Sequence, residues 1–281
     1  MSDGVPYLVI GHVTVDHTPN GREWGGTALF GAVTALRLGA HVHVLTSAPA
    51  EDLAHVLPEG IETVNVPSPV WCTFTHEFVG DVREQYITAV AANLRAEHLP
   101  AAWRSLPLVH YGPLVQEIDH DLLTAFPVAL RGASVQGWLR EWHDNGHVQP
   151  LDRDKMLAWA PPVDISFLSE EDIGSQRAVI DFYRTQHRIV VLTDGNHGAT
   201  VFEGHESTRI PAYPVEEADA NGAGDVFSAA FLVRYYQSKD AVDAARFAAV
   251  VASFHVEQLG TDGIPTLRQA EERLLEYDGL G

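Results

Sequence analysis

The segment from Asp219 to Phe227 reads D-A-N-G-A-G-D-V-F and places small residues and two carboxylates just before a helical pattern. Gly222 and Gly224 are poor helix formers, so their position at a helix start needs a geometric or chemical reason. The N–H groups of a first helical turn have no partner inside the helix, and the helix dipole favours negative charge there. We therefore expect Gly222, Ala223 and Gly224 to admit a phosphate to these groups, as an anion hole.

Asp225 follows this expected anion hole directly. A carboxylate in that place can accept the proton of a hydroxyl that attacks a phosphate, which is the role of a general base in phosphoryl transfer. The spacing alone leaves a second interpretation equally open, in which Asp219 or Asp225 only caps the helix and the glycines relieve packing. A dinucleotide-binding turn is disfavoured, because G-A-G-D-V-F lacks a third glycine and no buried strand precedes it.

Composition sets the classes of partner. The 281 residues are 46% apolar, and 38 acidic against 18 basic side chains give a net charge of -20, which disfavours nucleic acids and anionic membranes as partners. Cys72 is the only cysteine, so an internal disulfide and a cysteine-built zinc site are excluded. The first residues carry no basic leader and no apolar run reaches the length of a membrane span, so we expect a cytoplasmic protein.

Short apolar runs alternate with helical patterns, which predicts βαβ units and a parallel sheet within a single domain over 1–281. The segment Phe74–Thr88 breaks this pattern, because it alternates with a period of two around Gly80 and Asp81 and is typical of a β-hairpin. The expected strands are Tyr7–Ile10, His41–Leu45, Ile61–Val66, Leu108–Tyr111, Val163–Leu168 and Ile189–Thr193, and the expected helices are Thr27–Leu38, Ser175–Gln186, Gly222–Tyr236 and Ala241–Gln258.

At D-A-N-G-A-G-D the chain resembles the ribokinase-like carbohydrate kinases, the PfkB family, whose motif has the form D-T-x-G-A-G-D. Ala220 replaces the usual threonine. The paired glycines of G-G-T-A-L-F-G-A, from Gly25, resemble the family's N-terminal motif, and G-H-V-T-V-D places Asp16 where the family has an aspartate that binds substrate hydroxyls. V-L-T-D-G-N-H-G-A, from Val191, resembles the nucleotide-side strand and turn, so the resemblance spans essentially the whole chain.

The resemblance implies an α/β fold, a three-layer α/β/α sandwich with a small β lid, and direct in-line transfer of phosphate from magnesium-bound ATP to a polyol. It implies that Asp225 is the catalytic base and that Gly222, Ala223 and Gly224 form the anion hole. The implied acceptor residues are Asp16, Gly25 and Gly26, and the implied nucleotide residues are Thr193, Gly195, Gly198, Ala252 and Ser253. It leaves a monovalent-cation requirement open.

Three departures from the family pattern bear on these expectations. Phe30 stands where the family often has an asparagine, and we expect its ring to offer an apolar face to the acceptor. Few residues separate Asp16 from Gly25, so we expect a reduced lid supplied mostly by the hairpin, which a partner subunit in a homodimer would complete. The N-x-x-E motif that the family links to metal binding stands here as Ser169–Asp172 without its asparagine, which leaves the metal ligands unknown.

The acceptor stays open among a cyclitol, a sugar and a nucleoside. H-Y-G-P-L at His110 and V-Q-G-W-L-R at Val135 are similar to segments of plant inositol kinases of this family, which favours a cyclitol such as inositol. A catalytically silent binding protein on the same fold is the alternative from another class, and the intact G-A-G-D motif argues against it. A zinc pair at His143 and His147 is disfavoured, since Asn145-Gly146 breaks the helix that such a pair requires.

Overall fold

A nine-stranded sheet forms the centre of the molecule, in a computed structural model that describes residues 4–19, 21–79, 82–174 and 176–278. Its strand order is β15-β14-β13-β12-β9-β8-β1-β4-β5. All neighbours pair in parallel except β13-β14 and β14-β15, which are antiparallel. The strands of this sheet are β1 (Pro6–Ile10), β4 (His41–Ala48), β5 (Ile61–Pro67), β8 (Leu108–Tyr111), β9 (Leu130–Ser134), β12 (Ile165–Ser169), β13 (Ile189–Thr193), β14 (Ala199–Glu203) and β15 (Glu206–Ile210).

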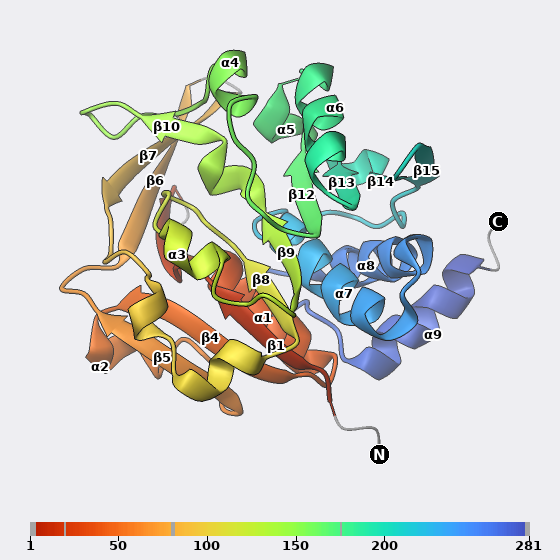
Figure 1. Cartoon of the computed structure of the whole chain (residues 1–281), viewed down its shortest axis with the longest axis horizontal. Coiled ribbons are helices and arrows are strands. Elements are labelled where there is room, and N and C mark those ends of the chain that lie inside the picture. The colour runs from red at the N-terminus through yellow and green to blue at the C-terminus, as the bar shows by residue number, and fades with distance from the viewer. Residues whose placement is uncertain (1–3, 20, 80–81, 175, 279–281) are drawn as a thin grey trace.

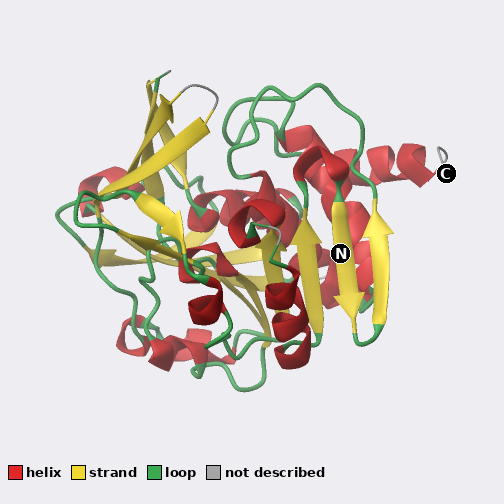
Figure 2. Cartoon of the chain, turned by 90° about the horizontal axis from the view of Figure 1, so that it is seen from above, coloured by secondary structure: helices red, strands yellow, loops and turns green. Residues whose placement is uncertain are grey.

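Helices cover both faces of this sheet (Figures 1 and 2). The α-helices are α1 (Thr27–Arg37), α2 (Ala50–Leu53), α3 (His120–Leu123), α4 (Arg153–Met156), α5 (Glu170–Ile173), α6 (Arg177–Gln186), α7 (Ala223–Ser238), α8 (Ala241–His255) and α9 (Leu267–Asp278). The 3-10 helices are η1 (Ala96–His98), η2 (Ala101–Ser105), η3 (Val135–Trp138) and η4 (Gly195–His197). The expected three-layer α/β/α sandwich is confirmed.

Strand β1 shows why the layers form. Tyr7 and Val9 pack into one hydrophobic cluster together with α1, α7 and α8, while Leu8 and Ile10 pack into the cluster on the opposite face. Successive side chains of a strand point to opposite faces, so an unbroken apolar run is what a strand covered on both sides requires. The apolar run that begins at Tyr7 therefore fixes β1 in the interior of the sheet.

A second sheet, here called the lid because the sequence predicted a lid at its hairpin, has the strand order β3-β2-β6-β7. The expected hairpin is present as β6 (Cys72–Val79) and β7 (Val82–Ala89), and its turn at Gly80-Asp81 lies outside the described residues. The short segment around Asp16 adds two strands, β2 (Thr14–Thr18) and β3 (Gly21–Gly25), which the sequence did not predict. The hairpin thus stands beside two further strands, at the upper left of Figure 2.

A small hairpin of β10 (Arg140–Trp142) and β11 (Val148–Pro150) lies next to the lid strands in Figure 1. Its turn contains His143 and His147, so these residues face each other across a turn rather than along a helix. His143 Nε2 is 3.0 Å from Gln149 Oε1. Within the described ranges, no helix is long and apolar enough to cross a membrane.

Candidate active site

The loop before α7 is held in place by the end of α8. Asp219 accepts hydrogen bonds from the N–H groups of Asn221 (2.9 Å) and Gly260 (3.2 Å), and the N–H groups of Ala218 and Asp219 donate to Val256 O. Gly222 is the N-cap residue of α7, with a φ of 80° that favours glycine, and no side chain of the described residues caps this helix. Asp219 therefore stabilises the loop, and the helix start stays open.

Phe30 packs directly beneath this loop. Its side chain is 1% exposed, and a Cβ atom added to Gly222 would lie 2.4 Å from the Phe30 ring. The Phe30 ring also meets the His255 ring edge-on at a centroid distance of 5.3 Å, while His255 Nε2 is 2.7 Å from Asn221 O. Phe30 does not line the pocket described below. The expectation that its ring faces the acceptor is corrected, because α1 turns this side chain toward the loop.

The start of α7 presents free donors. The Ala223 N–H donates to Ala220 O at 3.1 Å, whereas the N–H groups of Gly224 and Asp225 find no acceptor within the described part of the chain. A Cβ atom built on Gly224 would meet no atom within 4 Å. Two backbone donors without a described acceptor thus lie at the positive end of the helix dipole, beside the open space at Gly224, which is the arrangement of an anion site.

Asp225 lies at this helix start with its carboxylate fixed. Thr27 Oγ1, from the first residue of α1, donates to Asp225 Oδ1 at 2.6 Å. Burial raises the Asp225 pKa to about 6; the Thr27 hydrogen bond and the charge of Arg140 lower it, and the charges of Asp172 and Asp16 add to the rise. A carboxylate with a pKa near 6 is still mostly ionised at neutral pH and is a better proton acceptor than an ordinary aspartate.

A cavity of about 370 Å³, here called the lid pocket, lies between the lid and the start of α7. Asp16 lies in it and is 6% exposed; its Oδ1 atom has no hydrogen-bond partner among the described residues, and its Oδ2 atom is 3.8 Å from His76 Nε2. Arg140 is the only basic side chain among the described lining residues. The others include Thr14, Gly26, Phe74, Gln85, Leu114, Gln136, Glu171, Asp172, Asn221, Gly222 and Asp225.

A second cavity of about 330 Å³, here called the apolar pocket, lies on the other side of the α7 start. Its lining is mainly aliphatic and aromatic, and none of its described lining residues is lysine or arginine. They include Asn196, Gly198, Ala212, Tyr213, Val215, Glu217, Phe227, Ala249, Ala252, Ser253 and Val256. Five residues line both pockets, namely Thr193, Gly195, Ala220, Ala223 and Gly224. The two cavities therefore meet at the open helix start.

The structure brings most of the residues that the sequence singled out to these two pockets. Gly25 leaves room for two lid-pocket side chains, because a Cβ atom there would lie only 2.7 Å from both Asp16 Oδ2 and Thr14 Oγ1. Ser169 and Asp172 form a reciprocal capping box at the start of α5. The Oδ1 atom of Asp172 also lies 3.9 Å from Arg140 Nη2. The asparagine-free motif is thus at the pocket, although no three His, Cys, Asp or Glu side chains of the described ranges cluster as a metal cage.

Thr27, Arg140 and Gln85 hold or charge the site and were not singled out from the sequence. Thr27 directly follows the paired glycines, which is the signal that could have found it. Arg140 ends the segment V-Q-G-W-L-R, and its Nη1 donates to Gln85 Oε1 at 3.0 Å. Gln85 lies on β7, so this bond joins the lid to the β10 hairpin. Nothing in the local sequence indicates a contact between residues 55 positions apart.

Comparisons with known proteins show which kinases this chain is similar to. The family model described as pfkB family carbohydrate kinase matches residues 144–267. This match covers less than half of the chain, and over these residues the chain is similar to the family. A ribokinase of Bacillus subtilis is 42% identical over 84 residues, which is 30% of this chain but only 29% of that protein. A cytidine kinase of Thermococcus kodakarensis is 26% identical over 85% of this chain and 91% of its own.

Solved structures share the fold of this chain. A structure from work on converting a pyrophosphate-dependent myo-inositol-1 kinase into a myo-inositol-3 kinase superposes with a TM-score of 0.76 and 24% identity, covering 97% of this chain and 99% of the other. At this identity the likeness shows the fold. The ribokinase-like fold and the family resemblance expected from the sequence are both confirmed.

Proposed function

We propose that the chain transfers the γ-phosphoryl group of magnesium-bound ATP to a hydroxyl of a small polyol, with a cyclitol such as inositol as the preferred acceptor. One observation carries the proposal: two pockets of different chemistry meet at an open helix N-terminus, and Asp225 stands there in the polar one. In-line transfer needs donor and acceptor on opposite sides of the moving phosphate.

The residues at the junction of the two pockets have different roles in the phosphoryl transfer. Asp225 accepts the proton of the attacking hydroxyl, and the Thr27 hydrogen bond keeps its carboxylate in one orientation. The N–H groups of Gly224 and Asp225, together with the helix dipole, stabilise the negative charge on the transferring phosphate. Arg140 supplies positive charge from the lid-pocket side, in a protein whose net charge of -20 otherwise repels phosphate.

The apolar pocket favours a nucleotide over pyrophosphate as the donor. Pyrophosphate is small and highly charged, and its recognition calls for basic side chains, which the described lining of this pocket does not supply. Val215, Phe227 and Ala249 offer instead an apolar slot of the kind in which a nucleobase is buried. The slot opens onto the helix start at Gly224, where the terminal phosphate of a bound nucleotide would lie.

Magnesium fits this site as an ion carried by the nucleotide. Mg²⁺ in kinases is bound through one or two carboxylates plus substrate phosphates and water, so an all-protein cage is not needed. Glu171 and Asp172 lie in the lid pocket next to the residues shared with the apolar pocket. We assign the ion to these two carboxylates; when bound, it offsets the charge of the donor phosphates.

The lid pocket favours a polyhydroxylated ring as acceptor. The Oδ1 atom of the Asp16 carboxylate is buried and has no hydrogen-bond partner among the described residues, so the carboxylate can accept hydrogen bonds from vicinal hydroxyls. Gln85 and Gln136 add amide groups to the same cavity. Phe74 and Leu114 supply the apolar surface for ring C–H groups that Phe30 was expected to supply. The segments H-Y-G-P-L at His110 and V-Q-G-W-L-R at Val135, which are similar to segments of plant inositol kinases, support a cyclitol as first choice.

A nucleoside is the second candidate acceptor. The cytidine kinase noted above is 26% identical and matches 85% of this chain and 91% of its own length. The same Asp16 carboxylate would then bind the ribose hydroxyls, and Phe74 or Leu114 would contact the base. The two candidates differ in the acceptor and share the donor, the base and the anion site.

A steady-state assay with two donors and a panel of acceptors tests the proposal. Nucleotide or pyrophosphate consumption is measured with myo-inositol, ribose, fructose and cytidine, with and without Mg²⁺. We expect turnover with ATP and not with pyrophosphate, a requirement for Mg²⁺, and the highest kcat/KM for inositol. Turnover only with pyrophosphate would overturn the donor assignment, and a higher kcat/KM for cytidine would favour the second candidate.

A further inference from the structure

The C-terminal helix α9 contacts two residues that line the apolar pocket, Ser253 and Tyr213. We propose that Arg273 on this helix is a positioning residue for the phosphate donor, acting through Tyr213 and Ser253. This inference rests on the proposed function, since it takes the apolar pocket to be the donor site. It adds a role for a helix that lines neither the lid pocket nor the apolar pocket with any described residue.

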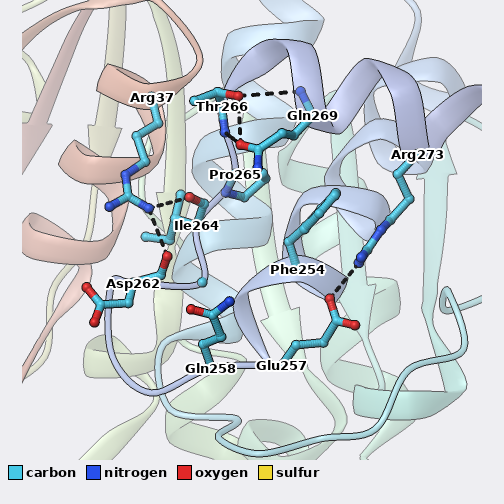
Figure 3. Close-up of a pocket in the computed structure, with 11 residues that line it drawn as sticks. Arg37, Phe254, Glu257, Gln258, Asp262, Ile264, Pro265, Thr266, Gln269 and Arg273 are labelled. Atoms are coloured by element: carbon cyan, nitrogen blue, oxygen red, sulfur yellow. Dashed lines mark hydrogen bonds and ion pairs between the residues drawn. The ribbon is translucent and has the colours of Figure 1, made fainter.

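Arg273 has four contacts that together fix its guanidinium group. Its Nη1 atom donates to Ser253 Oγ at 3.0 Å. The same atom donates to Glu257 Oε2 at 2.8 Å (Figure 3). Its guanidinium carbon lies 3.3 Å from the centroid of the Phe254 ring and 5.2 Å from that of the Tyr213 ring. Only 17% of the Arg273 side chain is exposed. Ser253 and Tyr213 both line the apolar pocket, so one side chain holds two parts of its wall.

The part of the wall that carries Tyr213 has little support of its own. Strand β15 ends at Ile210, and residues 211–220 form neither a strand nor a helix. Besides Arg273, helix α9 contributes Tyr277, whose hydroxyl donates to Pro211 O at 2.8 Å and whose ring centroid lies 5.8 Å from that of Tyr213. Because no ladder of backbone hydrogen bonds fixes this segment, its position depends on contacts of this kind.

A further cavity lies beside Arg273, so no packed side chain among the described residues stands ready to replace its contacts with Ser253 and Tyr213. This cavity, of about 400 Å³, lies between α1, the end of α8 and α9, and it is the one drawn in Figure 3. Arg273 lines it together with Glu257 and Phe254, so one side of the Arg273 side chain borders open space rather than packed core. Removing the guanidinium group would leave Ser253 and Tyr213 without a neighbour on that side, and the wall of the apolar pocket would loosen.

The consequence is a specific kinetic signature. Loss of one charge-assisted hydrogen bond and one cation–π contact at the donor wall is expected to raise the donor KM about tenfold. The acceptor KM and kcat should change less than about twofold, because the lid pocket and Asp225 are not touched. The same loss should weaken binding of a nonhydrolysable ATP analogue about tenfold when measured by calorimetry.

Three variants separate positioning from a general loss of structure. Arg273→Ala removes all four contacts, and Arg273→Lys keeps the charge and a donor for Ser253 but not the planar stacking, so its donor KM should lie between wild type and Ala. Arg268→Ala is the matched control on the same helix, since the Arg268 side chain is 86% exposed and its ion-pair partner among the described residues is Glu272, one turn away. It should leave donor KM and nucleotide affinity unchanged.

The outcomes distinguish this inference from the proposed function. An unchanged donor KM and analogue affinity in Arg273→Ala would overturn the role of Arg273, while the kinase proposal stands. A parallel loss of kcat and of both KM values, with a lowered melting temperature, would also overturn it. A wild-type chain that binds the analogue but phosphorylates no polyol would refute the proposed function and leave the inferred role of Arg273 in donor binding standing. A wild-type chain that binds no nucleotide would overturn both.

Discussion

Replacing Asp225 with asparagine is expected to stabilise the fold and impair the reaction at the same time. Burial raises the Asp225 pKa from 3.8 to about 6, and the Thr27 hydrogen bond opposes this only in part. The folded state therefore holds the Asp225 proton more tightly than the unfolded state. Between these two pKa values the folded chain binds more protons, so the free energy of unfolding falls as pH rises.

The size of this effect follows from the pKa values. A rise of about two pKa units lowers the free energy of unfolding by about 3 kcal/mol. This destabilisation is complete at pH values above the folded pKa of about 6, and it disappears below the unfolded pKa. Asparagine keeps an acceptor for Thr27 without the charge. We expect Asp225→Asn to raise the free energy of unfolding by about 1–3 kcal/mol at pH 8, and the gain to vanish near pH 4.

Urea unfolding of both proteins at several pH values measures this difference. Asp243→Asn is the control of opposite sign, because the Arg234 hydrogen bonds, at 2.7 and 3.0 Å, lower the Asp243 pKa. The Asp243 carboxylate thus contributes stability that is present at neutral pH and lost as pH falls, and the variant should be less stable at pH 8. An Asp225→Asn protein that is less stable than wild type at pH 8 would refute the burial argument.

The same variant tests the role of Asp225 in the reaction. General base catalysis contributes about 10²–10⁴-fold, so Asp225→Asn should slow kcat by that order with nucleotide affinity nearly unchanged. In the wild type, kcat/KM should rise with pH through about 6, because protonated Asp225 cannot accept the hydroxyl proton. Near-wild-type turnover in the variant would remove Asp225 from the mechanism.

Three further substitutions or probes follow from the same geometry. Gly224→Val should abolish transfer without unfolding the chain, because a Cβ there meets no protein atom but fills the space before the α7 N–H groups; retained activity would place the phosphate elsewhere. Asp16→Ala should lower kcat/KM about tenfold or more for every polyol, while Asp52→Ala, at an exposed site, should not; equal activity of the two would refute hydroxyl binding by Asp16. Hydrogen exchange in 72–79 and 82–89 should slow when acceptor and a nonhydrolysable nucleotide bind, since Phe74 and Gln85 line the lid pocket; unchanged exchange would count against lid closure.

The parts of the fold that the sequence predicts are those whose signal is local. The unbroken apolar run that begins at Tyr7 requires burial on both faces, and the structure has a central strand there. The glycines before Asp225 predicted a helix start, and α7 begins at Ala223. Strands β2 and β3 were missed because they are short and mostly polar, with one large apolar residue each, Val15 and Trp24, so they carry little apolar periodicity.

The parts of the site that were missed depend on contacts between distant residues. Arg140 and Gln85 become neighbours only because the β10 hairpin folds against the lid, which no local pattern indicates. Phe30 was assigned to the acceptor from its position in a motif, but the orientation of α1 against Gly222 and His255 sets where its ring points. Tertiary packing therefore decides which residues of a motif face the pocket.

The most direct test of the account is a crystal structure with a nonhydrolysable ATP analogue, Mg²⁺ and myo-inositol bound together. We predict that the base lies in the apolar pocket, that the terminal phosphate accepts hydrogen bonds from the N–H groups of Gly224 and Asp225, and that one inositol hydroxyl lies about 3 Å from the Asp225 carboxylate. A terminal phosphate away from the α7 start, or an acceptor whose hydroxyls do not approach Asp225, would contradict the proposed transfer.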